Sequence, residues 1–347
     1  MTALPAAEST LMFREAQSSA ALIRAQLDAN AAPVARLAAR LRASAPRFIV
    51  TCARGSSDHA ATFAKYLFET QLGLSTASAS PSVSSVYAAP LKLDGALFVA
   101  ISQSGKSPDL VRNAEAARAA GAQVLALVNT EDSPLAAVAH DVIALQAGPE
   151  RSVAATKSYL CTLSALLQLA AAWGGRRELA DALDDLPAVL ARSWDSDWSA
   201  LTDGLAGARN LFVLGRGLGL GAAQEAALKF KETSGLHAEA FSAAEVKHGP
   251  MALIGSGFPL LVFAQDDGTQ AGTLAAAAEF RARGAQVFVA APGDPAGSTL
   301  PLPERVHPAC APLVQVQSFY RACNALALRR GHNPDVPPHL NKVTETV

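Results

Sequence analysis

The chain has 347 residues, half of them apolar, and its charged side chains nearly cancel to a formal net charge of −1. This size allows two domains, and the balanced charge indicates no nucleic-acid partner. The longest apolar stretch, near residues 160–173, is interrupted by polar side chains, so we expect no membrane span. The four cysteines are scattered without metal-ligand spacing, which predicts buried free thiols in a cytoplasmic protein.

Along the chain, predicted helices alternate with short apolar strands. Residues 9–43 predict two amphipathic helices. Strands are expected at residues 48–52, 96–102, 123–128, 211–214, 259–263 and 287–291. Further helices are expected at residues 58–72, 108–120, 157–193, 220–233, 270–283 and 313–330, before a proline-rich, extended tail at residues 333–347. Because apolar strands separated by helices form βαβ units, the sequence predicts an α/β fold with parallel sheets covered on both faces.

The second half of the chain resembles the first. Residues 119–127 return as residues 282–290, about 163 positions later. The loops differ, because Ser-Gln-Ser-Gly at residues 102–105 corresponds to Gln-Asp-Asp-Gly at residues 265–268. An α/β fold keeps its scaffold in the strands and its chemistry in the loops. We therefore expect a duplicated scaffold whose two halves divide one function.

Serine-rich turns follow two predicted strands of the first half. They contain Ser56 and Ser57 in one turn, and Ser102, Ser104 and Ser107 in the other. Each turn leads into a helix, whose N-terminus presents free N–H groups and a positive dipole end that suit a phosphate. Helix capping alone would also explain these serines. Two such turns at the carboxyl ends of parallel strands, both replaced in the second copy, favour a phosphate site.

Acidic and basic residues gather on one predicted helix of the second half. Glu225, Lys229 and Glu232 are spaced four and three apart, which puts them on one helix face. An exposed ladder of salt bridges would have the same spacing. The density of charge in an otherwise apolar chain favours a catalytic group. More charged residues follow shortly after: Glu239, Glu245, Lys247 and His248.

A glycine pattern, Gly217-x-Gly219-x-x-Ala222, follows the first strand of the second half. It is similar to a dinucleotide-binding fingerprint. Such a site also needs an acidic residue at the end of a following strand, and none is convincing here. We interpret the pattern as a glycine-rich turn and expect no nucleotide cofactor.

Several motifs occur in the order found in one known family. Four segments resemble the isomerase domain of the glucosamine-6-phosphate synthases, a member of the sugar isomerase (SIS) family. They are residues 214–217, 225–232, 237–240 and 245–250. Three more segments match the same domain: Ser102-Gln103-Ser104-Gly105, Val153-Ala154-Ala155-Thr156-Lys157 and Leu340-Asn341-Lys342-Val343-Thr344. The resemblance implies two tandem doubly wound parallel-sheet SIS subdomains with flanking helices and an extended C-terminal tail.

The resemblance also implies an organisation in four parts. A helical region is expected at residues 1–44, a phosphate-binding SIS subdomain at residues 45–195 and a catalytic SIS subdomain at residues 196–332. The tail at residues 333–347 is expected to carry an active-site lysine.

Roles for individual residues follow from the same resemblance. Glu232 is implied as the base that moves a proton between C1 and C2, and His248 as the ring-opening group supplied by the neighbouring subunit of a homodimer. Lys342 matches a lysine that can form a Schiff base with the open ketose. Glu225 and Lys229 match residues near the reacting end of the sugar. The implied substrate-binding residues are Ser57, Ser102, Gln103, Ser104 and Ser107 for the phosphate, with Ser56 of the same turn, and Val153 and Ala155 for the sugar.

Two departures from the synthases suggest a reaction. The synthases begin with a glutaminase domain whose N-terminal cysteine releases ammonia, whereas this sequence has no cysteine before Cys52. Ala155 also stands where the synthases usually have a serine, which removes one hydroxyl from the sugar-binding loop. We therefore expect ammonia release, as in the stand-alone SIS-type glucosamine-6-phosphate deaminases that the chain resembles.

The expected reaction converts glucosamine 6-phosphate and water to fructose 6-phosphate and ammonium, and it needs no metal or organic cofactor. Two other enzyme activities fit the same scaffold, namely a fructosamine-6-phosphate deglycase and a galactosamine-6-phosphate deaminase. A non-catalytic sugar-phosphate sensor is the alternative from another class. The sequence determines neither the sugar epimer nor the physiological direction, allosteric control or oligomeric state beyond an expected dimer.

Overall fold

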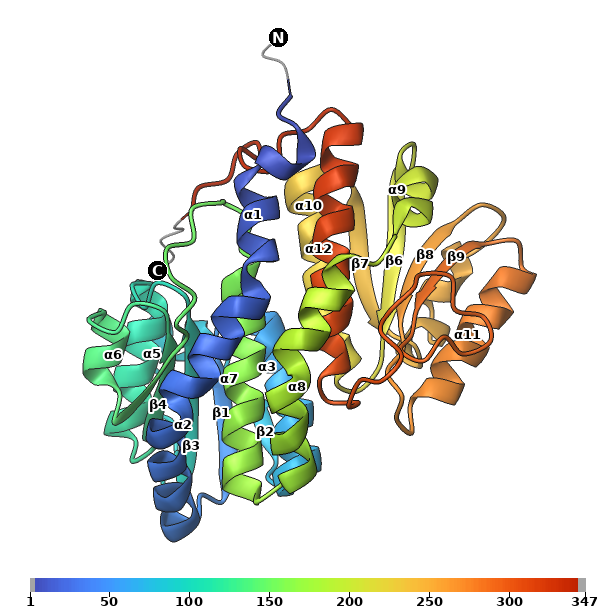
Figure 1. Cartoon of the computed structure of the whole chain (residues 1–347). Helices are drawn as coiled ribbons and strands as arrows, with labels where there is room; N and C mark the ends of the chain where they lie inside the picture. Colours follow the sequence, from blue (N-terminus) through green and yellow to red (C-terminus); the bar gives the residue numbers. More distant parts are fainter. Residues whose placement is uncertain (1–3, 343–347) are drawn as a thin grey trace. The chain divides into compact units, whose positions relative to one another are not determined.

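The computed structural model describes residues 4–342 and contains two parallel β-sheets, as the sequence predicts (Figure 1). The chain divides into two compact units, which we name after their sheets. The sheet-A unit comprises residues 21–149 and 158–184. The sheet-B unit comprises the described residues up to 20, residues 150–157 and residues 185–342.

Sheet A has five parallel strands in the order β2-β1-β3-β4-β5. They are β1 (Phe48–Cys52), β2 (Thr76–Ser78), β3 (Ala96–Ser102), β4 (Gln123–Val128) and β5 (Asp141–Ala144). The helices of this part of the chain are α2 (Ser19–Ser44), α3 (Ser56–Leu72), α4 (Pro81–Ser85), α5 (Pro108–Ala119), α6 (Pro134–Val138), α7 (Lys157–Gly174) and α8 (Arg177–Trp194). Every residue of β3 is buried, which is why this central strand reads as a continuous apolar run.

Helix α5 covers one face of sheet A. Its Leu110 and Ala114 belong to one apolar cluster with Phe98 of β3 and Val124 of β4. Helix α3 contacts β1, β2 and β3. Both helices begin shortly after the carboxyl ends of strands, α3 after β1 and α5 after β3.

Sheet B has four parallel strands in the order β7-β6-β8-β9. They are β6 (Asn210–Gly215), β7 (His237–Ser242), β8 (Pro259–Phe263) and β9 (Gln286–Ala290). The helices of this unit are α1 (Leu11–Gln17), α9 (Ser199–Leu205), α10 (Gly219–Ser234), α11 (Gln270–Ala282) and α12 (Ala311–Arg329), with short 3₁₀ turns η1 (Ala7–Ser9), η2 (Glu245–Lys247) and η3 (Pro250–Leu253). The first four strands of sheet A have the same order and direction as these four strands.

Helices cover both faces of sheet B. Phe280 of α11 packs with Leu260 and Val262 of β8 on one face. On the other face, Phe319 of α12 contacts Phe263 of β8, with ring centroids 6.4 Å apart, and Phe230 of α10, with ring centroids 5.0 Å apart. Sheet B is therefore wound on both sides, as the sequence predicts.

The predicted elements are found, but several short ones were not predicted. Strands β2, β5 and β7 lie at sheet edges, and α9 precedes β6. The residues of β7 are mostly exposed or half-buried, so their sequence lacks the long apolar run of a central strand. Of the predicted tail, residues 333–342 form turns and contain no helix or strand, and the rest lies outside the described residues.

No helix in the described part of the chain is long and apolar enough to span a bilayer.

Candidate active site

Two strand-end turns of the sheet-A unit are joined by an ion pair. Arg54 follows β1 and Asp109 lies in the first turn of α5, which follows the neighbouring strand β3. The Arg54 Nε and Nη2 atoms each lie 2.9 Å from Asp109 Oδ2. The Asp109 side chain is fully buried, and a buried carboxylate needs such a partner. The pair holds the two serine-bearing turns together, and the sequence analysis missed both residues.

The serine hydroxyls after β3 differ in what they bind. Ser102 Oγ accepts the Gly105 N–H at 3.1 Å, and Ser104 Oγ accepts the Lys106 N–H at 3.3 Å. Ser107 is the N-cap of α5, yet its hydroxyl makes no capping hydrogen bond. Helix capping therefore does not explain Ser107. The hydroxyls of Ser102 and Ser104 still have their protons to donate.

The remaining predicted phosphate-binding residues lie in the same two turns. Ser56 and Ser57 form the first turn of α3, which begins two residues before the predicted start at residue 58. Gln103 is half-buried, and its backbone carbonyl accepts the Asn129 N–H at 3.0 Å. All of these predicted residues thus belong to the carboxyl ends of the adjacent strands β1 and β3.

In the sheet-B unit, α10 carries a buried charge cluster. Lys229 Nζ lies 2.5 Å from Glu232 Oε2 and 3.4 Å from Glu225 Oε1. Lys229 and Glu225 are buried, whereas the Glu232 side chain is 21% exposed. An exposed salt-bridge ladder, the other interpretation of this spacing, is thereby excluded. The Tyr320 hydroxyl of α12 donates to Glu225 Oε1 at 2.9 Å, a contact between residues far apart in the sequence.

The cluster keeps Lys229 charged. Burial by itself lowers the pKa of Lys229, but the carboxylates of Glu225 and Glu232 outweigh burial and raise the pKa above its ordinary value. The ammonium therefore orients Glu232 through Oε2. Among the described residues, no hydrogen bond reaches Glu232 Oε1.

The charged residues after α10 do not join this cluster. Glu239 is exposed on β7, and Glu245, Lys247 and His248 are exposed in and after η2. Lys247 pairs instead with Glu279 Oε2 at 2.7 Å. No described hydrogen bond or ion pair links His248 to the α10 cluster, so its role across a dimer interface stays a prediction.

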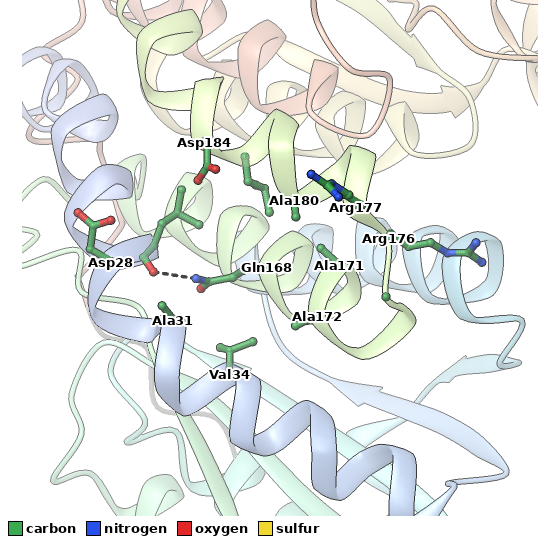
Figure 2. Close-up of a pocket in the computed structure, with 13 residues that line it drawn as sticks. Asp28, Ala31, Val34, Gln168, Ala171, Ala172, Arg176, Arg177, Ala180 and Asp184 are labelled. Atoms are coloured by element: carbon green, nitrogen blue, oxygen red, sulfur yellow. Dashed lines mark hydrogen bonds between the residues drawn. The ribbon is translucent and has the colours of Figure 1, made fainter.

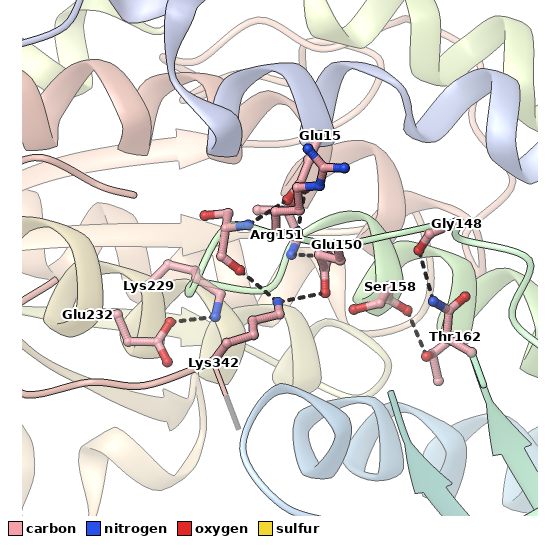
Figure 3. A network of polar contacts seen from close by, with 12 residues as sticks. Glu15, Gly148, Glu150, Arg151, Ser158, Thr162, Lys229, Glu232 and Lys342 are labelled. Carbon is pink, nitrogen blue, oxygen red and sulfur yellow. Dashed lines mark hydrogen bonds and ion pairs between the residues drawn. The ribbon is translucent and has the colours of Figure 1, made fainter. Parts of the chain in front are cut away.

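Lys342 lies against the loop that contains Val153 and Ala155. Its Nζ atom donates to the Ser152 carbonyl at 2.6 Å and lies 3.2 Å from Glu150 Oε2 (Figure 3). The sequence analysis did not identify Glu150 or Ser152. A signal was present, since this acidic residue lies three positions before the matched motif.

The sheet-A unit also contains a cavity of about 510 Å³ among α2, α7 and α8 (Figure 2). Small apolar side chains such as Ala31, Val34 and Ala171 line it, together with Gln168, whose Nε2 donates to the Leu27 carbonyl at 2.8 Å. None of the predicted site residues lines this cavity. It is separate from the serine-bearing turns.

The four cysteines are buried and free, as predicted. Burial is the main cause that raises the pKa of Cys52, Cys310 and Cys323 to about 12 in each case. These side chains are therefore neutral thiols and poor nucleophiles at neutral pH. Within residues 4–342, no group of three or more His, Cys, Asp or Glu side chains is arranged to hold a metal ion.

Comparison with known proteins places these features in one family. The SIS domain model matches residues 44–172 and 204–294, which is more than half of the chain. The chain belongs to the SIS domain family. Membership of this family agrees with the two parallel sheets of the structure and with the order of the motifs in the sequence.

Individual relatives are consistent with this membership. The chain is 35% identical over 296 residues to a glutamine–fructose-6-phosphate aminotransferase (isomerizing) of Methanothermobacter thermautotrophicus, covering 83% of this chain and 50% of that protein. The chain thus spans about half the length of the curated relatives that it matches. A crystal structure of a proposed phosphosugar isomerase from Silicibacter pomeroyi is 44% identical with a TM-score of 0.89, covering 94% of this chain and 100% of that one.

A glucosamine-6-phosphate deaminase from Thermotoga maritima shares the fold. Its TM-score is 0.79 at 20% identity, covering 97% of this chain and 100% of that one. At this identity, the likeness shows a shared fold.

Proposed function

We propose that this SIS domain protein is an amino-sugar-phosphate deaminase that converts glucosamine 6-phosphate and water to fructose 6-phosphate and ammonium. The observation that carries the proposal is the partial exposure and the hydrogen bonding of the Glu232 carboxylate. This carboxylate is partly exposed, oriented through one oxygen by the buried Lys229 ammonium at 2.5 Å, and has its other oxygen directed to no described partner. A carboxylate held in this way suits proton abstraction next to a carbonyl.

We assign phosphate binding to the serine-bearing turns of the sheet-A unit. The α5 N-terminus provides free backbone N–H groups, and the Ser107 hydroxyl is not used for capping. Ser57, Ser102, Gln103 and Ser104 add further hydrogen-bonding groups. Binding the phosphate supplies energy that positions the reacting carbons.

We assign proton transfer to Glu232. In the open-chain sugar, Glu232 accepts the C2 proton and returns a proton to C1, which turns the amino aldose into a ketose imine. Hydrolysis of this imine, by way of Lys342, then gives the ketose and ammonia. Lys229 keeps Glu232 oriented, and Glu225 together with Tyr320 keeps Lys229 in place.

Two further residues complete the proposed reaction. His248, supplied by a second copy of the chain, assists ring opening. Lys342 forms a Schiff base at C2 and so promotes release of ammonia. Val153 and Ala155, in the loop next to Lys342, contact the sugar.

A second candidate is an aldose–ketose isomerase that acts on a neutral sugar phosphate. The 44% identity to a proposed phosphosugar isomerase supports it. It would use the same Glu232 chemistry, because moving a proton between C1 and C2 is common to both reactions.

The two candidates are separated by products. Purified protein is incubated with glucosamine 6-phosphate, galactosamine 6-phosphate, fructosamine 6-phosphate, glucose 6-phosphate and fructose 6-phosphate. Ammonium is measured with glutamate dehydrogenase, and the sugars are identified by NMR. We expect ammonium and fructose 6-phosphate from glucosamine 6-phosphate. Aldose–ketose exchange without ammonium from any amino sugar would reject the deaminase and favour the isomerase.

A further inference from the structure

The contacts of Lys342 draw attention to Glu150, a residue to which the sequence motifs assigned no role. Lys342 is 26% exposed on its side chain, whereas the Glu150 carboxylate beside it is fully buried. Two acceptors hold the ammonium, namely Glu150 Oε2 at 3.2 Å and the Ser152 carbonyl at 2.6 Å (Figure 3). The Glu150 carboxylate can take a proton from this ammonium, whereas the Ser152 carbonyl cannot.

Glu150 is itself held in a fixed orientation. Its Oε1 atom accepts the Thr156 N–H at 3.0 Å, so the other carboxylate oxygen is directed to Lys342. The loop is also tied to α1, because Glu15 accepts the N–H groups of Arg151 at 2.6 Å and Ser152 at 3.1 Å. Hydrogen bonds from backbone donors to a carboxylate are strong and directional. The loop thus presents both acceptors to Lys342 in one geometry.

The tail that carries Lys342 is tied to the same helix. Asp335 accepts the N–H groups of Leu11 at 2.6 Å and Met12 at 2.8 Å, the first two residues of α1. Helix α1 therefore binds the tail at its start and the loop through Glu15. The tail and the loop are therefore both anchored to one helix.

The two active-site lysines differ in their neighbours. Lys229 is buried between the carboxylates of Glu225 and Glu232, which raise its pKa and keep it charged. Lys342 is partly exposed and faces one carboxylate. An ammonium cannot attack a carbonyl or imine carbon, so a lysine that forms a Schiff base must first lose a proton.

We propose that Glu150 is the positioning residue for Lys342, holding its ammonium at the reacting end of the sugar and taking its proton as the amine attacks C2. The proposal rests on the proposed function. The Lys342 ammonium gives one proton to Glu150, and the free amine adds to the protonated ketose imine. Ammonia leaves and carries the remaining proton away as ammonium, so that the new C2–N bond becomes a neutral Schiff base. Water then releases fructose 6-phosphate, and Glu150 returns the proton to Lys342.

The test traps the Schiff base directly. Full-length protein is mixed with fructose 6-phosphate and sodium cyanoborohydride across a pH series, and the reduced adduct is measured by intact mass and located by peptide mapping. Glu150→Gln keeps the side-chain volume and an oxygen for the Thr156 N–H, but it cannot take a proton. We expect at least a tenfold slower adduct formation at Lys342 at neutral pH, with partial recovery in Glu150→Asp.

Three controls separate the possible outcomes. Lys342→Ala must lose the adduct, Glu178→Gln on the exposed surface of α8 must keep it, and thermal melting must show that Glu150→Gln is folded. An unchanged or faster adduct in folded Glu150→Gln would overturn the proposal, because Glu150 would then only keep Lys342 charged. Wild-type protein that releases ammonium but forms no adduct would also overturn it while leaving the deaminase intact. Protein that does neither would overturn the proposed function as well.

Discussion

Corresponding strands in the two sheets end in turns of different composition, although the strand order is the same. Strand β3 ends at Ser102. The turn that follows contains Gly105, whose φ is +64°. A Cβ at Gly105 would lie 2.1 Å from Ser133 Oγ, so only glycine fits this close approach. In this segment Ser102 is buried, and Ser104 and Ser107 are half-buried.

After β8, the corresponding position is Gln265, and the space is filled by protein. Gln265 is fully buried, and its Nε2 donates to the Arg216 carbonyl at 2.5 Å. A Cβ at Gly219 would lie 2.6 Å from Gln265 Oε1, so Gly217-x-Gly219 makes room for this side chain rather than for a nucleotide. Asp267 accepts the N–H of Thr269 at 2.8 Å and adds negative charge. The difference teaches that the side chains where the strand ends, not the strand order, decide what fills the turn.

From the comparison we expect substitutions in the sheet-B unit to lower kcat and substitutions in the serine-bearing turns to raise KM. Glu232→Gln is the strongest test. Removing a general base lowers kcat by about 10²–10⁴-fold, whereas the phosphate contacts remain. We therefore expect turnover of glucosamine 6-phosphate to be lost with fructose 6-phosphate binding retained, measured by the ammonium assay and by calorimetry. Near-normal turnover would remove Glu232 from the mechanism.

A second test concerns the buried charges of α10. Lys229→Met leaves Glu225 buried without its cation, which costs about 3–5 kcal/mol of unfolding free energy. Lys231→Met changes the same residue type at an exposed position of α10 and should have little effect. Urea denaturation of both variants measures the difference, and equal stabilities would contradict the importance of the buried pair.

The same cluster predicts a pH dependence. The folded-state pKa of Lys229 is raised above the ordinary value of 10.5. Its contribution to stability is therefore fully present below pH 10.5 and is lost as the pH rises toward the folded-state pKa. Wild-type protein should lose stability in this alkaline range, and Lys229→Met should lack that part of the loss.

Ser107→Ala tests the binding half of the comparison. A hydrogen bond to a charged group contributes about 1.5–3 kcal/mol, so KM should rise by about 10- to 150-fold with kcat kept. Ser80 is a matched control, because it too is an N-cap before proline without a capping hydrogen bond. Ser80→Ala should leave both constants unchanged. A fall in kcat for Ser107→Ala at constant KM would argue against phosphate binding there.

The smallest effect concerns His248. If it acts in a neighbouring copy, mixed dimers of Glu232→Gln and His248→Asn chains contain one intact site, and co-expression restores about a quarter of the wild-type activity. Each variant purified alone serves as the reference. No recovery in verified mixed dimers would place His248 within its own chain.

The scaffold was predictable because its strands are central and apolar. Strands such as β3 and β8 are buried along their whole length, and α5 and α11 show helical spacing. The edge strand β7 was missed because half-exposed residues give no continuous apolar run. The serine turns and the α10 cluster were recognisable from residue types at strand ends and on one helix face.

The partners of these residues were not predictable. Asp109 binds Arg54, and Tyr320 binds Glu225 from a helix that follows three further strands. Glu150 and Lys342 meet although they are 192 positions apart. Such contacts produce no local sequence pattern, because they depend on which helices and strands pack together.

The sequence by itself determined the α/β class, the parallel strands and the residue types available for chemistry, because period and composition are local properties. Tertiary structure alone decided which charges are buried. Lys229 and Lys247 both lie near glutamates in the sequence, yet the Lys229 side chain is 1% exposed and that of Lys247 is 43% exposed. The reason is that α12 packs over α10 and removes Lys229 from water, whereas η2 stays at the surface.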